Sequence, residues 1–104
     1  MSHTERDIYF LRESFRLAEE AGKQGIHPFA AILVDADGNV LMEQLNAFLP
    51  DHDMTGHAER VLMTRASTTW GPEFLADCTM YTSAEPCAMC AGAVYWTGVG
   101  RVVY

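Results

Sequence analysis

The stretch Tyr81-Thr82-Ser83-Ala84-Glu85-Pro86-Cys87-Ala88-Met89-Cys90 leads from the end of a short apolar strand into a helix. Pro86 suits the first turn of that helix, because a proline there costs no hydrogen bond. Cys87 and Cys90 are three residues apart, so both sulfurs lie on one helix face and can reach one ion. The start of a helix also favours a thiolate over a thiol. The stretch therefore predicts a strand followed by a helix whose first turn binds a metal.

A second stretch, His57-Ala58-Glu59, supplies the groups that the cysteines lack. One imidazole and two thiolates are zinc ligands, and a zinc with three protein ligands keeps its fourth position open for water. Glu59 points away from the histidine's own helix face, so it can approach that water without ligating the metal. We expect His57, Cys87 and Cys90 to bind Zn²⁺ and Glu59 to be the catalytic acid and base.

Outward from these stretches, the chain alternates between helices and strands. Helices are expected over Asp7–Ala21, from about His57 to Ser67, and from Cys87 to about Trp96. Strands are expected over Ala30–Val34, Val40–Leu45, Cys78–Thr82 and Arg101–Tyr104. The first helix would turn Ile8, Leu11, Phe15 and Ala18 to the core, and the second would bury Val61, Leu62 and Ala66. Glycines or prolines at positions 22, 25, 71, 72, 98 and 100 are expected to end the helices.

The order of these elements predicts the fold class. The turn Asp35-Ala36-Asp37-Gly38-Asn39 joins the first two strands into an antiparallel hairpin. The later strands alternate with helices, which favours parallel pairing through right-handed crossovers. We expect an α/β fold, with a mixed sheet between helices in a three-layer α/β/α sandwich. A chain of 104 residues is expected to form one domain over residues 1–104.

Charge and cysteine content narrow the class of partner. Fourteen acidic residues stand against seven Lys and Arg, for a net charge of −7, and Lys23 is the only lysine. Binding to nucleic acid normally needs a basic patch, so a small neutral substrate is expected, although a local patch of Arg60, Arg65 and Arg101 stays open. Three cysteines with a C-x-x-C are not a disulfide framework, and no apolar stretch is long enough for a bilayer. We expect a cytoplasmic protein with no membrane contact.

The cysteines allow two other interpretations. A thioredoxin-like dithiol needs its C-x-x-C after the first strand, whereas here the pair follows the third strand, and His57 and Glu59 would have no role. A non-catalytic fragment stabilised by zinc is the second alternative and stays open. Cys78 lies in a strand with no histidine beside it and is expected to be a small buried apolar residue.

These residues resemble the cytidine-deaminase-like zinc hydrolases, in particular the branch of bacterial guanine deaminases and tRNA adenosine deaminases. The resemblance covers nearly the whole chain and includes 28–31 (PFAA), Asn46, Asp53, Thr55, 57–59 (HAE), 81–87 (YTSAEPC) and 90–93 (CAGA). It implies the same zinc ligands, the proton shuttle of Glu59 and the three-layer fold. It also implies a homodimer and a pocket with substrate contacts from Asn46, Phe29, Ala58 and Ser83. Asp53 would fix the loop before His57.

Weaker signals bear on the substrate. The stretches Ala93-Val94-Tyr95-Trp96, Asp77-Cys78 and Thr82-Ser83 resemble the guanine deaminases. The lack of basic residues disfavours a tRNA partner, so guanine or a related purine or triazine base is expected. The stretches 87–93 and 100–104 resemble the tRNA adenosine deaminases, which are the alternative. Ala30 stands where a glycine is usual, and Met54-Thr55-Gly56 where Pro-Thr-Ala is usual. Such relatives continue past Tyr104, so the chain is expected to lack their C-terminal strand and helices.

Overall fold

The computed structural model describes all residues 1–104 and has eight helices and strands. In chain order they are α1 (His3–Lys23), β1 (Ala30–Val34), β2 (Val40–Leu45), α2 (Ala58–Ser67), α3 (Pro72–Leu75), β3 (Thr79–Thr82), α4 (Ala88–Thr97) and β4 (Arg101–Val103). None of the helices has both the length and the apolar character needed to cross a membrane.

The four strands form one mixed sheet in the order β2-β1-β3-β4. β1 pairs antiparallel with β2, where Ala30 faces Leu45, and antiparallel with β3, where Ala31 faces Thr82. β3 and β4 pair in parallel through a crossover that contains α4. The antiparallel hairpin and the mixed sheet predicted from the element order are confirmed.

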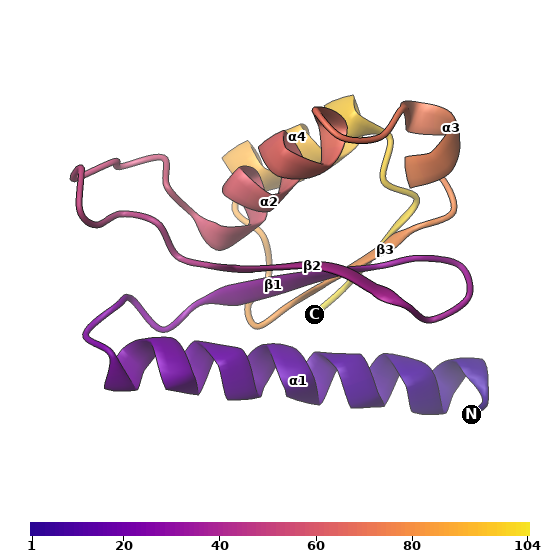
Figure 1. Cartoon of the computed structure of the whole chain (residues 1–104), viewed down its shortest axis with the longest axis horizontal. Coiled ribbons are helices and arrows are strands. Elements are labelled where there is room, and N and C mark those ends of the chain that lie inside the picture. Colours follow the sequence, from indigo (N-terminus) through magenta and orange to yellow (C-terminus); the bar gives the residue numbers. More distant parts are fainter.

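Helices cover both faces of the sheet, which confirms the predicted three-layer α/β/α sandwich. Figure 1 shows α1 along one face and α2, α3 and α4 on the other. β1 is buried on both faces, and its side chains alternate between two cores. Ala31 and Leu33 pack with α2, whereas Ile32 and Val34 pack with Phe10 of α1.

The face that α1 presents to the sheet agrees only in part with the predicted one. Ala18 is buried and Leu11 is half-buried against the core, as predicted, whereas Ile8 and Phe15 are 47% and 48% exposed. Phe10, Ser14 and Ala21 are buried in their place. The helix carries two apolar stripes, Ile8-Leu11-Phe15 and Phe10-Leu17-Ala21, both at helical spacing. Periodicity alone cannot choose between such stripes; packing of Phe10 against Tyr81, with ring centroids 5.3 Å apart, selects the second.

The ends of α1 also lie outside the predicted bounds. The helix begins at His3 because the Ser2 hydroxyl accepts a hydrogen bond from the Glu5 amide (3.1 Å), as an N-cap does. It continues through Gly22, its predicted end, and stops only before Gly25, whose φ of +78° is left-handed. A left-handed glycine is a common helix stop. The N-cap serine and the position of this glycine account for the longer helix.

The remaining differences are small. Glu59 and Met63 are buried on α2 beside the predicted Leu62 and Ala66, while Val61 is only half-buried. α3 lies outside the predicted elements: Pro72, expected to break a helix, stands at the first position of a short one, which proline tolerates. Cys78 is buried as expected, directly before β3. Gly98, with a φ of +85°, ends α4 as predicted.

Candidate metal centre and active site

His57 and Cys87 occupy equivalent positions, because each is the N-cap of a helix. His57 precedes α2 and Cys87 precedes α4, so both helices begin one residue later than predicted and Pro86 lies before the cap. Ser, Thr, Asp and Asn are the usual N-cap residues, since their side chains bond the free amides of the first turn. Neither His57 nor Cys87 makes such a bond. The two side chains do not cap their helices and face each other instead. Such a departure from local preference is typical of a functional site.

The ligand atoms of His57, Cys87 and Cys90 all lie within 4.8 Å of one another. Nδ1 of His57 is 3.5 Å from the Cys87 sulfur and 3.6 Å from the Cys90 sulfur. Zinc bonds of about 2.1 Å to nitrogen and about 2.3 Å to sulfur, at a tetrahedral angle, place those atoms about 3.6 Å apart. The donor set and its spacing therefore fit a zinc ion.

The two thiols differ in environment. Cys87 is exposed, and the pKa of its thiol is lowered, first by the backbone amide of Cys90, which stabilises the thiolate. Cys90 is buried, and burial raises the pKa of its thiol to about 12. Zinc binds thiolates, so its binding releases the proton that burial otherwise holds on Cys90.

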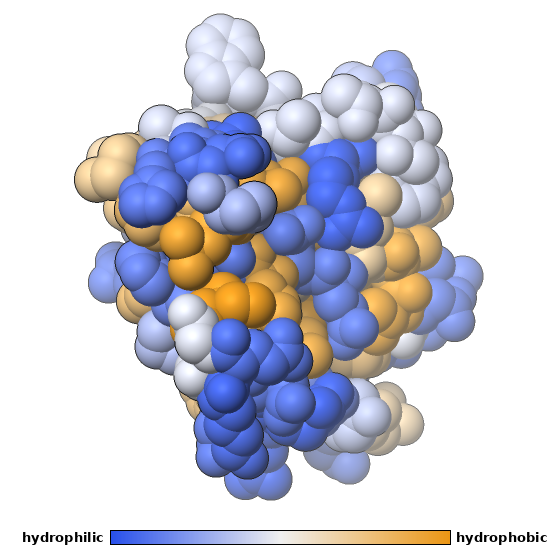
Figure 2. All heavy atoms as spheres, turned by 60° about the vertical axis from the view of Figure 1, so that its left-hand side comes forward, coloured by the Kyte–Doolittle hydropathy of each residue, from blue (hydrophilic) through white to orange (hydrophobic).

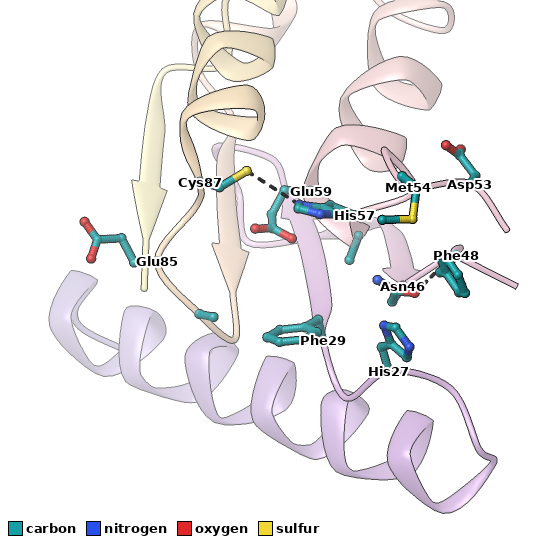
Figure 3. A pocket seen from close by; sticks show the side chains of 12 residues that line it. His27, Phe29, Asn46, Phe48, Asp53, Met54, His57, Glu59, Glu85 and Cys87 are labelled. Carbon is teal, nitrogen blue, oxygen red and sulfur yellow. Dashed lines mark hydrogen bonds between the residues drawn. The ribbon is translucent and has the colours of Figure 1, made fainter.

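Glu59 stands in the first turn of α2 and is only 7% exposed. Burial disfavours its charged form and raises the pKa of the carboxyl, although the nearby His57 acts in the opposite direction. Figure 3 shows the Glu59 carboxylate beside the His57 ring and the Cys87 sulfur, facing into the same hollow. A buried carboxyl with a raised pKa beside three metal-binding groups is suited to proton transfer.

A cavity of about 440 Å³ opens in front of these groups, within the size range of small-molecule sites. Its lining is His27, Phe29, Asn46, Phe48, Asp53, Met54, His57, Ala58, Glu59, Ala84, Glu85 and Cys87. The face of the molecule on this side has apolar residues at its centre, framed by hydrophilic ones (Figure 2). The lining has three carboxylates and no lysine or arginine.

Three of the four predicted substrate contacts line this cavity. They are Phe29 at the end of the loop before β1, Asn46 directly after β2, and Ala58 at the start of α2. Ser83 is not among the lining residues: its hydroxyl accepts a hydrogen bond from the Ala30 amide (3.1 Å) and so joins the ends of β1 and β3. Contact of Ser83 with substrate therefore stays a prediction.

Asn46 is held in one orientation. Its Oδ1 accepts a hydrogen bond from the Phe48 amide at 2.9 Å, an arrangement typical of an Asx turn. The side-chain NH₂ has no partner in the protein, and in Figure 3 it points toward the hollow. Asn46 therefore offers the cavity a hydrogen-bond donor rather than an acceptor.

The loop before His57 is stabilised by Asp53 and Gly56. The Asp53 carboxylate accepts hydrogen bonds from the Thr55 amide (2.9 Å) and hydroxyl (2.8 Å) and lies 3.6 Å from the Arg60 guanidinium. Gly56 packs so closely that a Cβ there would lie 2.5 Å from the Ala47 carbonyl oxygen. Gly56 stands where the related proteins usually have alanine, and here the close approach of the Ala47 backbone requires a glycine.

Sequence reasoning missed the residues at the far side of the cavity. His27, Phe48 and Met54 come from irregular loops, where neither periodicity nor metal-ligand spacing gives a signal. Pro28 is the only local indication, since a proline favours a turn. The Phe29 amide donates to the His27 carbonyl (2.8 Å). This i to i+2 bond makes a γ-turn around Pro28 and brings both flanking side chains to the cavity.

A three-layer α/β/α sandwich whose helix starts bring together one histidine and two cysteines defines a class of zinc-binding enzyme domains. Comparison with known families agrees. Residues 4–104 match the model of the cytidine and deoxycytidylate deaminase zinc-binding region, and the chain belongs to this family.

Individual relatives act on different substrates. The chain is 42% identical over 101 residues to a probable cytosine deaminase of Schizosaccharomyces pombe, covering 97% of this chain and 60% of the relative. It is 33% identical over 101 residues to a tRNA-specific adenosine deaminase of Haemophilus influenzae (97% and 58%). The solved structure of guanine deaminase from Bacillus subtilis superimposes with a TM-score of 0.80 at 37% identity, covering 98% of this chain and 62% of that one. The chain thus spans about three fifths of the length of these relatives.

Proposed function

We propose that this protein is a zinc-dependent hydrolytic deaminase of a small aminated heterocycle, with guanine or a related purine or triazine base as the first candidate. The observation that carries the proposal is the convergence of Nδ1 of His57 and the sulfurs of Cys87 and Cys90 within 4.8 Å, beside a buried Glu59 in the same cavity. Family membership supports the proposed reaction type.

In the proposed mechanism, His57, Cys87 and Cys90 would hold the zinc ion, which would make a bound water acidic enough to react at neutral pH. A carboxylate oxygen of Glu59 takes a proton from this water and passes it to the ring nitrogen next to the carbon under attack. The carboxylate then takes the second proton of the water and delivers it to the departing amine. Water and the aminated ring carbon thereby give a carbonyl and ammonia.

The charge of the cavity supports an uncharged substrate. Asp53, Glu59 and Glu85 are in the lining, and no lysine or arginine is. A phosphate group in this cavity would meet no lysine or arginine and would be repelled by the carboxylates. Free bases and nucleosides are therefore favoured over nucleotides and over tRNA.

A screen for ammonia release tests the proposal. The zinc-loaded protein would be offered guanine, cytosine, adenine, their nucleosides and aminotriazines. Release from at least one free base, lost on treatment with a chelator and restored by zinc, is expected. No release from any compound by a protein that binds zinc would contradict an enzymatic role and favour a non-catalytic zinc-stabilised domain.

A tRNA adenosine deaminase is the second candidate, because a tRNA-specific relative matches 97% of the chain. It requires salt-sensitive RNA binding, which the net charge of −7 opposes. A gel shift of tRNA at low salt, together with inosine formation, would favour this candidate over the free-base deaminase.

We also infer that the protein forms a homodimer through α4. This helix has no charged residue, and its outward Tyr95 and Trp96 are 77% and 84% exposed. Two copies that each carry a charge of −7 repel, and an uncharged helix is a surface on which they can still meet about a two-fold axis. Sedimentation should show a dimer that Trp96→Glu dissociates and that Phe15→Glu, at an exposed site on α1, does not; a monomeric wild type would contradict the inference.

None of the three cysteines forms a disulfide. Cysteines without disulfides are usual in a reducing compartment, which supports the proposed cytoplasmic location. Enzyme activity in a cytosolic fraction would test it.

A further inference from the structure

The end of the cavity away from the metal-binding groups is built by two stacked aromatic rings. The imidazole of His27 lies on the ring of Phe48 with centroids 5.2 Å apart and an interplanar angle of 12°. In Figure 3 these rings lie at the opposite side of the lining from Cys87 and Glu59, with Asn46 between them in that view. The two rings come from different loops, before β1 and after β2.

Backbone bonds fix both rings of this pair. The γ-turn around Pro28 sets the position of His27, and the same loop is tied to the end of β2 by a bond from the Asn46 amide to the Phe29 carbonyl (3.1 Å). The amide of Phe48 donates to Asn46, and its carbonyl accepts from the Asp53 amide at 2.9 Å. The pair is therefore a formed part of the cavity wall and not a chance contact.

Stacking holds the plane of the His27 ring but uses neither of its nitrogens. No hydrogen bond joins Nδ1 or Nε2 to any other group of the protein. A neutral imidazole has one donor and one acceptor nitrogen. The ring edge of His27 can therefore donate a hydrogen bond to a heterocycle or accept one from it. Asn46 adds a donor on the path from the metal-binding groups to this edge.

We propose that His27 is a specificity-determining residue that hydrogen-bonds the second ring of a bicyclic, purine-like base and so selects such bases over single-ring substrates. This rests on the proposed deaminase function, which fixes the aminated carbon beside Glu59. From that anchor the fused five-membered ring of a purine extends toward His27, whereas a pyrimidine ends short of it. The cavity of about 440 Å³ leaves room for two fused rings, since it equals roughly 15 water volumes.

The test compares two variants of His27 with one of His52. His27→Phe keeps a ring to stack on Phe48 and removes both nitrogens, while His27→Ala removes the stack as well. His52→Asn is the matched control, because His52 contacts Phe48 but does not line the cavity. The φ of His52 is 58°, a left-handed value that asparagine tolerates. Ammonia release from guanine and from cytosine is measured for each protein, together with zinc content.

His27→Phe should lower kcat/KM for guanine by about tenfold, the value of one hydrogen bond, mainly through KM. The ratio of guanine to cytosine kcat/KM should fall by the same factor, while His52→Asn leaves it unchanged and all variants keep their zinc. Where cytosine is not turned over, its inhibition constant replaces kcat/KM. An unchanged ratio in His27→Phe, or a wild type that prefers cytosine, would overturn the proposal. Absence of ammonia from every ring would instead contradict the deaminase function itself.

Discussion

The two ends of the cavity are built in different ways. At the metal end, His57 and Cys87 are the N-caps of α2 and α4, and Cys90 follows one turn later in a buried position. At the other end, His27 and Phe48 stand on irregular loops and are held by a γ-turn, an Asx turn and each other. Helices packed on a sheet hold the side chains of their first residues in fixed positions, whereas loops tolerate changes of sequence. The metal end can therefore keep one reaction while the loop end changes the substrate.

Removal of a metal ligand should produce the largest effect, and it tests the metal end of the cavity. Cys90→Ala should abolish zinc binding and ammonia release, and should lower the free energy of unfolding by several kcal/mol because zinc binding is coupled to folding. Metal analysis and thermal melts measure both. Cys78→Ala changes another buried cysteine outside the cavity, so it should keep its zinc. Equal zinc loss in both variants would mean that the metal end is not specified by these ligands.

A change at Asn46 probes the boundary between the two ends. Asn46→Asp keeps an oxygen for the Phe48 amide and removes the NH₂ that faces the cavity. We expect kcat/KM to fall about 10- to 100-fold with zinc content unchanged, because a substrate acceptor would face a carboxylate. Steady-state kinetics beside metal analysis measures this, and a loss of zinc would show that the two ends are not independent.

Gly56→Ala should disturb the loop end through the backbone. The added Cβ would lie 2.5 Å from the Ala47 carbonyl oxygen, so the loop must shift. Such a shift costs about 1–3 kcal/mol of unfolding free energy. A denaturant melt should show this loss, with a raised KM and retained zinc. Gly22→Ala is the control: its Cβ would meet only the Pro28 side chain at 3.5 Å, and within a helix it should stabilise by up to about 1 kcal/mol.

The smallest expected effect lies outside the cavity, where Asp7 of α1 bonds Arg101 (2.8 Å) and the Tyr81 hydroxyl (2.5 Å). The hydrogen bond from Arg101 lowers the pKa of Asp7 below 3.8. A lowered carboxyl pKa gives stability that is present above the unfolded pKa and is lost as the pH falls through the folded one. Asp7→Asn should thus cost about 1 kcal/mol at pH 7, because the pair is partly screened by solvent.

Melts of Asp7→Asn and wild type should converge as the pH falls through the lowered pKa of Asp7, because the carboxyl is then protonated in both folded and unfolded chains. Zinc content and activity of Asp7→Asn at pH 7 should equal those of wild type. A difference in unfolding free energy that persists at low pH would contradict this assignment of Asp7.

Tyr81 gives stability with the opposite pH dependence, because burial raises the pKa of its hydroxyl from 10 to about 12. The stability that it contributes is therefore present below pH 10 and is lost as the pH rises toward 12.

The same contrast explains what could be predicted from the sequence. The strand and helix order, the mixed sheet and the residues of the metal end follow from short-range patterns, namely alternation, a C-x-x-C and a histidine with a glutamate two residues on. The buried face of α1 could be predicted only in part: Ala18 is buried as expected, but two apolar stripes compete and only contact of Phe10 with Tyr81 selects one. Nor could His27 and Phe48, which meet through loops that carry no periodic signal.

The separation of metal binding from proton transfer is tested by the zinc content and ammonia release of Glu59→Gln beside wild type, with the base that wild type deaminates best. Glu59 lines the cavity but is not one of the three converging ligand groups. We expect about one zinc per chain in both proteins and a fall in kcat of at least about 10²-fold in the variant, the value of a general acid and base. Loss of zinc from Glu59→Gln, or full activity with zinc retained, would contradict that separation.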